Sequence, residues 1–423
     1  MDLLLKKATI VDPNSVYNGE QMDILILDGK IHAIDRDINR ADAQNMDCST
    51  AFISPGWMDV GVQTGDPGFE HREDLQSVAR AAAAGGFTAI ACQPNTDPVI
   101  HSKSEVLYLR NNTKGNLVDF YPFGAISKQC QGTEITEMYD MYHSGAIAFS
   151  DGNKPVQHAG VMMRALQYVK AFDGVVINQP QDLSISSGGL MHEGLMSTSL
   201  GVRGLPNLAE DLMVERDINL AQYTDSRLHL ANISTAGAVA AVRKAKQNGL
   251  AVTASVPAIN LVFEDGKLAD FDSNLKVMPP LRDSSDRQAL LEGVLDNTID
   301  MITSNHVPWD TEAKNLEFAY AEFGVVGLET TFAMLNTYLS EELSPDLLVE
   351  KMAINPRRVF NLEIPKIKLK QTANLTVFDT KQKWVFQEKD IYSKSQNTPF
   401  LNHSFTGKIL GVVNHNQSVF YSR

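Results

Sequence analysis

The chain has 423 residues, of which 43% are hydrophobic and 21% are charged, and its formal net charge is −14. This composition is typical of a globular protein, and the lack of a Lys or Arg run argues against nucleic acid or anionic membranes as partners. The three cysteines contain no CxxC pair, so neither a disulfide framework nor a thiolate zinc site is expected. The N-terminal sequence has no signal-peptide pattern, and no apolar run approaches the ~20 residues of a membrane helix. We therefore expect a cytoplasmic protein.

Both ends of the chain are predicted to form short strands. Turn signals such as Asp28-Gly29 separate apolar runs that are rich in β-forming residues. Two β-rich ends around a different middle predict one small β-sandwich domain, built from residues 1–52 and 366–423. The expected strands are Leu3–Val11, Met22–Leu27, Lys30–Ile34, Asn374–Phe378, Trp384–Gln387 and Lys408–Asn414.

Residues 53–365 alternate strand-like runs with helical patterns such as Asp74–Ala84, which ends at Gly85-Gly86. Eight such units predict a (β/α)₈ barrel of the TIM type with insertions, since about 250 residues is typical. An open doubly wound sheet usually carries GxGxxG after its first strand, and this chain has none there. The eight expected strands are Trp57–Val62, Thr88–Gln93, Phe120–Ala125, Ala146–Ser150, Gly174–Asn178, Arg227–Asn232, Ala251–Val256 and Asp300–Ser304.

The carboxyl ends of these strands, where barrels of this type carry their chemistry, are dominated by amides. Gln63, Asn95, Gln179, Asn232 and Asn305 follow five of them. Amides form hydrogen bonds, but they do not titrate, they are poor zinc ligands and they cannot act as a general base. This rim is suited to binding a polar ligand and poorly equipped to hydrolyse one.

Titratable groups are sparse at the strand ends. The ten histidines include no HxH or HxxxH pair, and the main candidates are Asp151 and His306. A catalytic zinc normally needs three protein ligands. Each candidate also has a structural interpretation: Asp151 can cap the segment after it, and His306 can be a hydrogen-bonded structural residue. Arg282 can equally anchor a carboxylate, and His71, in the charged run Glu70–Asp74, is expected to be solvated.

A series of short motifs runs through nearly the whole chain in a fixed order. It comprises Ser54–Asp59, Asp66–Gly68, Gly85–Thr88, Gln93–Thr96, Ile233–Ala236, Pro279–Arg282, Gly327–Thr330, Asn355–Arg357, Asn374–Asp379 and Asn397–Phe400. Together these motifs resemble the dihydroorotases of pyrimidine biosynthesis, in particular the longer type found beside aspartate transcarbamoylase. Each motif alone is weakly specific, whereas the ordered series is strongly specific. The resemblance implies the barrel of the amidohydrolase superfamily.

The positions at which the resemblance implies metal ligands are substituted. The HxH pair of the first strand corresponds to Gly61 and Gln63, and the histidines of the fifth and sixth strands correspond to Gln179 and Asn232. The eighth-strand aspartate, which the family uses for metal binding and proton transfer, corresponds to Asn305. The loop after the fourth strand keeps Asp151, the one remaining candidate ligand. We therefore expect no metal and no catalytic residue.

The resemblance and the substitutions together predict a catalytically inactive protein that acts as a structural or regulatory partner of aspartate transcarbamoylase, itself a homodimer. One alternative is an active dihydroorotase or cyclic amide hydrolase with an atypical zinc site that uses Asp151 and His306. Another is a non-catalytic binder of dihydroorotate or carbamoyl aspartate, which would be stabilised by its ligand. The expected remnant of the substrate pocket is Asn95, Asp151, Asn232, Asn260, Arg282 and His306.

Overall fold

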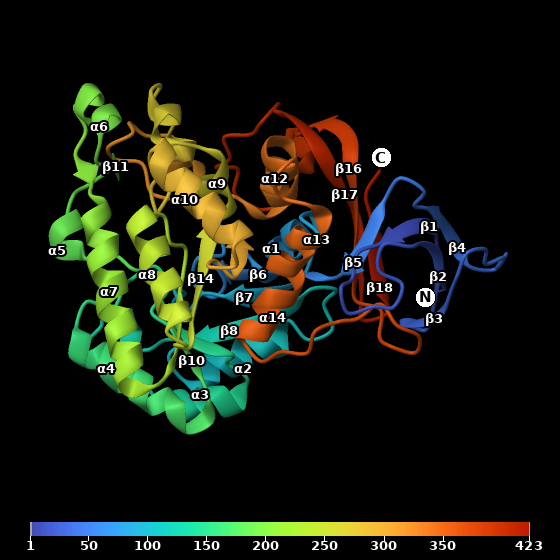
Figure 1. Cartoon of the computed structure of the whole chain (residues 1–423), viewed down its shortest axis with the longest axis horizontal. Coiled ribbons are helices and arrows are strands. Elements are labelled where there is room, and N and C mark those ends of the chain that lie inside the picture. Colours follow the sequence, from blue (N-terminus) through green and yellow to red (C-terminus); the bar gives the residue numbers. More distant parts are fainter. Residues whose placement is uncertain (1, 423) are drawn as a thin grey trace.

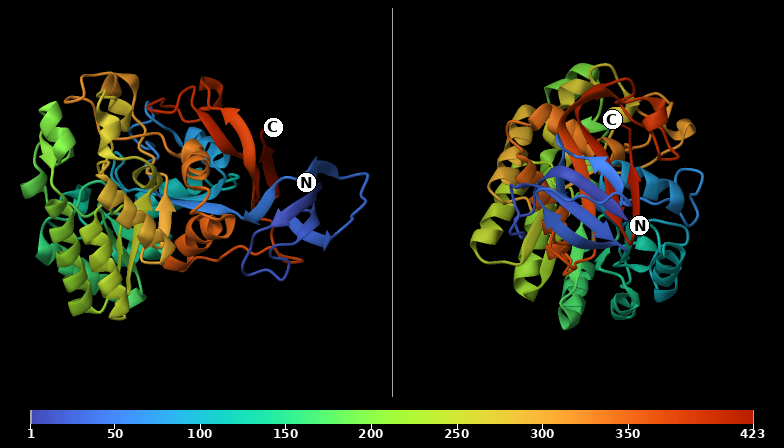
Figure 2. Two further views of the ribbon diagram at one scale, coloured as in Figure 1. Left: turned by 45° about the horizontal axis from the view of Figure 1, so that its top comes forward. Right: turned by 90° about the vertical axis from the view of Figure 1, so that its right-hand side faces the viewer.

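The computed structural model describes residues 2–422, and two eight-stranded sheets organise them. One sheet forms a barrel surrounded by helices, and the other forms a smaller domain to which both ends of the chain contribute (Figure 1). The first and last strands belong to this one sheet, with three other strands between them, and lie away from the barrel helices, as the two views of Figure 2 also show. The expected combination of a barrel and a terminal β domain is confirmed.

The barrel contains all eight predicted strands, and every hydrogen-bonded pair of neighbours is parallel. Their order in the sheet follows the order in the chain. The strands are β6 (Trp57–Val62), β7 (Phe87–Cys92), β8 (Asp119–Gly124), β9 (Ala148–Ser150), β10 (Val175–Asn178), β13 (Arg227–Leu230), β14 (Val252–Pro257) and β15 (Met301–Thr303).

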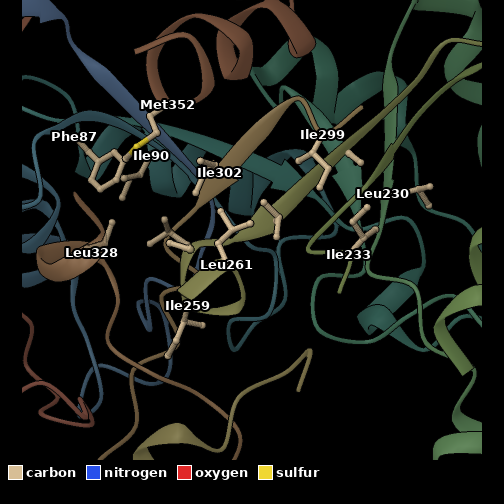
Figure 3. Close-up of a cluster of buried hydrophobic side chains, with 14 of the residues drawn as sticks. Phe87, Ile90, Leu230, Ile233, Ile259, Leu261, Ile299, Ile302, Leu328 and Met352 are labelled. Carbon is tan, nitrogen blue, oxygen red and sulfur yellow. The ribbon is translucent and has the colours of Figure 1, made fainter. Parts of the chain in front are cut away.

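Helices connect successive strands and cover the outside of the barrel (Figure 1). Their buried faces pack on the strands in one hydrophobic core, of which Figure 3 shows Phe87, Ile90, Ile302 and Met352. No helix among residues 2–422 is both long and apolar enough to cross a membrane. The helices are α1 (Leu75–Ala84), α2 (Lys103–Asn112), α3 (Met138–Ser144), α4 (Ala159–Val169), α5 (Leu183–Ser186), α6 (Leu195–Leu200), α7 (Asn207–Thr224), α8 (Ala236–Gln247), α9 (Ala258–Val262), α10 (Ser284–Leu295), α11 (Thr311–Lys314), α12 (Thr331–Leu339), α13 (Pro345–Val349) and α14 (Asn355–Val359).

Hydrogen bonds join the first barrel strand, β6, to the segment that directly follows the last one, β15. The backbone N–H of Gln63 donates to the carbonyl of His306 at 3.2 Å. The carboxylate of Asp59 on β6 accepts the backbone N–H of Ser304 at 2.9 Å and also its hydroxyl. Asp59 is fully buried, and this burial raises the pKa of its carboxyl to about 6. A buried carboxylate is costly unless it is hydrogen-bonded. By accepting the two hydrogen bonds from Ser304, Asp59 links the first barrel strand to the last, at the seam where the barrel closes.

The small domain is one connected sheet with its own core. Its strand order is β18-β17-β16-β5-β1-β2-β3, with β4 also paired to β1. Residues from both chain ends, such as Leu5, Ile24, Val377 and Leu410, pack in a single hydrophobic cluster. The strands are β1 (Leu3–Ile10), β2 (Gln21–Leu27), β3 (Lys30–Asp35), β4 (Gln44–Asp47), β5 (Phe52–Pro55), β16 (Leu375–Val385), β17 (Ser404–Asn414) and β18 (Gln417–Phe420).

Candidate functional site

A cavity of about 490 Å³ lies at the carboxyl ends of the barrel strands. The residues at all five positions where the resemblance implies metal ligands line this one cavity. They are Gly61, Gln63, Gln179, Asn232 and Asn305. The structure thus brings together residues from separate strand ends, at the end of the barrel where such folds carry their active sites.

Two of these residues are bonded to each other. Asn232 and Asn305 both have left-handed backbones, with φ of 55° and 52°. The Nδ2 of Asn232 donates to the Oδ1 of Asn305 at 3.3 Å, and the hydroxyl of Thr303 donates to the Oδ1 of Asn232 at 2.8 Å. The Nδ2 of Asn305 donates to the carbonyl of Met278 at 3.1 Å. The amide groups at two of the positions where the resemblance implies ligands are therefore already engaged within the protein.

Two side chains that directly follow the second barrel strand, β7, occupy the space beside two glycines. Gly61 has a φ of +86°, and a Cβ added there would lie 3.1 Å from the Nε2 of Gln93. Gly152 has a φ of +64°, and a Cβ added there would lie 1.7 Å from the Oδ1 of Asn95. Asn95 also accepts the backbone N–H of Asn153 and donates to the carbonyl of Asp151, both at 3.0 Å. Asn95 therefore fills the space in front of Gly152 and fixes the loop after β9.

Asp151 turns away from the cavity. Its buried carboxylate accepts the backbone N–H of Ser127 at 2.9 Å and the Ser127 hydroxyl. Burial raises the pKa of Asp151, while the hydrogen bonds from Ser127 act in the opposite direction. Asp151 is not among the residues that line the cavity. This geometry corresponds to a structural role that joins the loops after β8 and β9.

His306 also lies outside the cavity lining and is fully buried with Glu73. The Nε2 of His306 donates to the Oε2 of Glu73 at 3.3 Å. Glu73 accepts the hydroxyls of Ser77 and Ser393 as well. Burial opposes ionisation of Glu73, but the hydrogen bonds and charge of His306 leave its pKa below the ordinary value. His71 is exposed as predicted, whereas Glu73 in the same charged run is not, because it bonds to segments distant in sequence.

Asn260 and Arg282 are engaged beside the cavity. The Nδ2 of buried Asn260 donates to the carbonyl of Pro280 at 2.9 Å. The guanidinium of Arg282 lies 3.4 Å from the carboxylate of Glu210 and donates to Ser234 Oγ at 3.0 Å and to the Leu205 carbonyl at 2.7 Å. Both members of this ion pair are buried. Arg282 therefore anchors the carboxylate of Glu210 on α7, as in the structural alternative that the sequence left open for this residue.

A second cavity, of about 200 Å³, adjoins the first and shares Gln63, Asn153 and Trp309 with it. Its lining includes Asn95, Arg72 and Lys154. The Arg72 guanidinium lies 3.8 Å from the centre of the Trp309 ring and 4.0 Å from the carboxylate of Asp310. Trp309 thus stands at the junction of the two cavities.

The segment after β15 forms a wall of the larger cavity that no sequence motif indicated. Its residues Trp309, Glu322, Phe323 and Gly324 line the cavity. Two buried lysines hold this segment in place. The Nζ of Lys276 donates to the carbonyls of Phe318 at 2.7 Å and Ala321 at 2.6 Å. The Nζ of Lys314 donates to those of Glu322 at 2.8 Å and Gly324 at 3.0 Å. Such lysines cannot be identified from sequence, because nothing local distinguishes them from surface lysines.

The side chains around the larger cavity do not form the donor set of a catalytic zinc. Zinc prefers thiolate, imidazole and carboxylate ligands. Among the described residues that line the cavity, Glu322 alone is ionisable, and it is exposed. A different group, His192, Asp283 and Asp286, has potential ligand atoms within 4.8 Å of one another. However, both oxygens of Asp286 accept hydrogen bonds and the Arg282 guanidinium lies 3.4 Å from His192, so this group is a poor cation site.

Comparisons with known proteins agree with the fold and with the resemblance. A family model described as dihydro-orotase-like matches residues 50–238. A curated protein named dihydroorotase from Pelotomaculum thermopropionicum is 41% identical over 409 residues, or 96% of each chain. Another of that name from Acetivibrio thermocellus is 39% identical over 410 residues, again 96% of each chain.

Solved structures with the same architecture share little sequence with this chain. An L-hydantoinase from Arthrobacter aurescens aligns with a TM-score of 0.85 at 22% identity, covering 99% of this chain and 96% of that one. A dihydropyrimidinase from Brevibacillus agri aligns with a TM-score of 0.83 at 18% identity, covering 99% and 95%. At these identities the alignments show a common fold.

Proposed function

The chain belongs to the dihydroorotase family, and we propose that within this family of amidohydrolases it is a member that does not hydrolyse cyclic amides. The observation that carries this proposal is the mutual hydrogen bond of Asn232 and Asn305 in a cavity lined by amides. These two positions, together with Gly61, Gln63 and Gln179, are those from which the resemblance implies that a metal is held.

The chemistry of hydrolysis explains why this substitution matters. A bound metal lowers the pKa of the attacking water from about 15.7 toward about 7, and a general base then accepts its proton. Carboxamides neither hold a zinc ion well nor accept a proton near neutral pH. Asn305 also donates to Met278, a role that a carboxylate could not fill. The residues around the cavity thus lack both the means to activate water and the acceptor for its proton.

The test is the metal content of the protein purified without added zinc, combined with dihydroorotate hydrolysis in the presence of zinc. We expect well below one metal per chain and no hydrolysis above the buffer rate. The relative from Pelotomaculum thermopropionicum, purified and assayed in parallel, controls for loss of metal during purification. About one metal per chain together with turnover would reject the proposal.

The second candidate is an active dihydroorotase, or another cyclic amide hydrolase, with an atypical zinc site. The identity of 41% to a curated protein named dihydroorotase favours it. This candidate requires Asp151 and His306 to leave Ser127 and Glu73 and to turn toward the cavity. If turnover is found, Asp151→Asn and His306→Gln should each abolish it, and unchanged turnover in both variants would exclude this site.

We also propose aspartate transcarbamoylase as a partner, with this chain acting as a homodimeric structural or regulatory subunit. The support is the resemblance to the longer dihydroorotases found beside that enzyme, together with an intact fold around an altered centre. Co-expression followed by size-exclusion chromatography tests the proposal. Co-migration and a changed transcarbamoylase activity are expected. Separate migration with unchanged activity would reject it.

A further inference from the structure

The larger cavity is unusual in the uniformity of its polar groups. Seven carboxamide side chains, from the ends of six different barrel strands, line it. A carboxamide offers a donor and an acceptor next to each other and carries no charge. A ligand matches several such groups best when it also presents N–H and C=O groups side by side.

Some of these amides keep free hydrogen-bonding capacity. The side chain of Gln63 and the Nε2 of Gln93 form no hydrogen bond with another group of residues 2–422, and both residues line the cavity. The Nε2 of Gln179 reaches the Met278 carbonyl only at 3.5 Å. The Oε1 of Gln93, a residue that is 7% exposed, is buried without a partner among the described residues. Unpartnered groups that a ligand in the cavity can reach, such as the side-chain amide of Gln63, favour binding of a ligand that completes their hydrogen bonds.

The charges around the cavity disfavour an anionic ligand. Glu322, the ionisable residue of the lining, is acidic. The charge of Arg282 is neutralised by Glu210. The charge of Arg72 interacts favourably with the carboxylates of Asp310 and Glu322. Lys154, in the adjoining cavity, is exposed and therefore well solvated. A carboxylate that entered among the amides would lose its hydration without gaining a close cation, which is unfavourable.

From this arrangement we propose that the cavity binds an uncharged ligand with amide or ureide edges, and binds it without hydrolysis. This inference rests on the proposed function and specifies the ligand class of the same site. It differs from the anionic dihydroorotate or carbamoyl aspartate expected from sequence. The ring of Trp309, at the junction of the two cavities, offers an apolar face on which a small ring can pack.

The test compares dihydrouracil with dihydroorotate, two probes with the same ring that differ in one carboxylate. Isothermal titration calorimetry on the full chain should show dihydrouracil binding at least about tenfold more tightly. Gln63→Leu and Gln93→Leu should each weaken dihydrouracil binding by about tenfold, as expected for one lost hydrogen bond. Gln76→Leu, at an exposed glutamine of α1, is the matched control and should leave binding unchanged.

Charge reversal provides a second readout. Glu322→Lys should reduce the preference for dihydrouracil by improving the binding of dihydroorotate. Tighter binding of dihydroorotate by the unmodified protein, or no binding of either probe at millimolar concentration, would overturn the inference. Chromatography of the same samples reports hydrolysis separately. Turnover of dihydroorotate would reject the proposed function. Tighter binding of dihydroorotate than of dihydrouracil, without turnover, would reject only the proposed ligand class.

Discussion

Asn232 and Asn305 share a side-chain hydrogen bond of 3.3 Å although they follow different barrel strands, β13 and β15. The pair continues to the Thr303 hydroxyl on one side and to the Met278 carbonyl on the other. Each link uses a specific donor or acceptor of an amide. This part of the cavity lining therefore depends on amide groups, and an acidic or basic side chain at either position should disturb the protein locally.

Replacement of Asn305 by Asp tests this directly. In Asn305→Asp, a carboxylate oxygen replaces the Nδ2 that donates to Met278, so two acceptors face each other. We expect urea denaturation at neutral pH to show a loss of about 1–3 kcal/mol of unfolding free energy. Asn402→Asp is the control, since Asn402 is exposed and has a similar backbone φ of 62°. Equal stability of the two variants would show that the hydrogen bond from Asn305 to Met278 does not stabilise the protein.

The buried pair Glu210–Arg282 should behave as a unit. Arg282→Met leaves the Glu210 carboxylate buried without its counter-charge and should destabilise the protein by about 3–5 kcal/mol. The double variant Glu210→Met/Arg282→Met should lose less than the sum of the two single variants in a thermal unfolding cycle. The exposed pair Lys128–Glu134 is the control, and its cycle should show about 0–1 kcal/mol. Additive effects at Glu210 and Arg282 would exclude their coupling.

Lys276 and Lys314 should control the order of the cavity wall. Lys276→Met and Lys314→Met each leave carbonyls of residues 318–324 without their donor, at about 1–3 kcal/mol for each buried group left unpaired. Hydrogen exchange should therefore accelerate in residues 315–324 more than in the barrel strands. Lys103→Met, at an exposed lysine of α2, should leave exchange unchanged. Uniform acceleration across the chain would mean that the lysines support the whole barrel instead.

Asp59 should give stability a characteristic pH dependence. Its carboxyl pKa rises from 3.8 to about 6 on folding because the group is buried, so the folded state binds its proton more tightly. Its contribution to stability is therefore fully present below pH 3.8 and is lost as the pH rises through about 6. Between about pH 4 and pH 7, the unfolding free energy of the wild type should fall by about 2 kcal/mol relative to Asp59→Asn.

The control for this measurement is Asp270→Asn, at an exposed aspartate. Its unfolding free energy relative to the wild type should stay constant over the same pH range. A constant difference for Asp59→Asn as well would mean that the hydrogen bonds from Ser304 cancel the effect of burial on the pKa of Asp59.

The barrel could be predicted from sequence because its strands are apolar runs that end in polar residues. Trp57–Val62 matches β6 residue for residue, whereas the run Ala146–Ser150 pairs only from Ala148 onward. In the small domain, two predicted strands, Asn374–Phe378 and Trp384–Gln387, overlap the two ends of one continuous strand, β16. The shift in register between Asp379 and Lys383 explains the polar break between them. Such a shift depends on the pairing partner, β17, and cannot be read from β16 alone.

The position of a side chain relative to the cavity can be inferred from sequence where the residue directly follows a strand, but not where its direction depends on distant partners. Gln63, Gln179 and Asn305 line the cavity as their positions after strands imply. Asp151 turns to Ser127, 24 residues away, and His306 turns to Glu73, 233 residues away. Both polar partners compete with the cavity for these side chains. The sequence identifies the titratable groups, but not which neighbours they contact.

The contact between Asn95 and Gly152 makes substitutions at these two positions depend on each other. A side chain introduced at position 152 alone would have its Cβ 1.7 Å from the Oδ1 of Asn95. Shortening Asn95 alone would remove its hydrogen bonds to Asp151 and Asn153. Either substitution alone is therefore unfavourable. Positions 95 and 152 should therefore accept new side chains only when both change together.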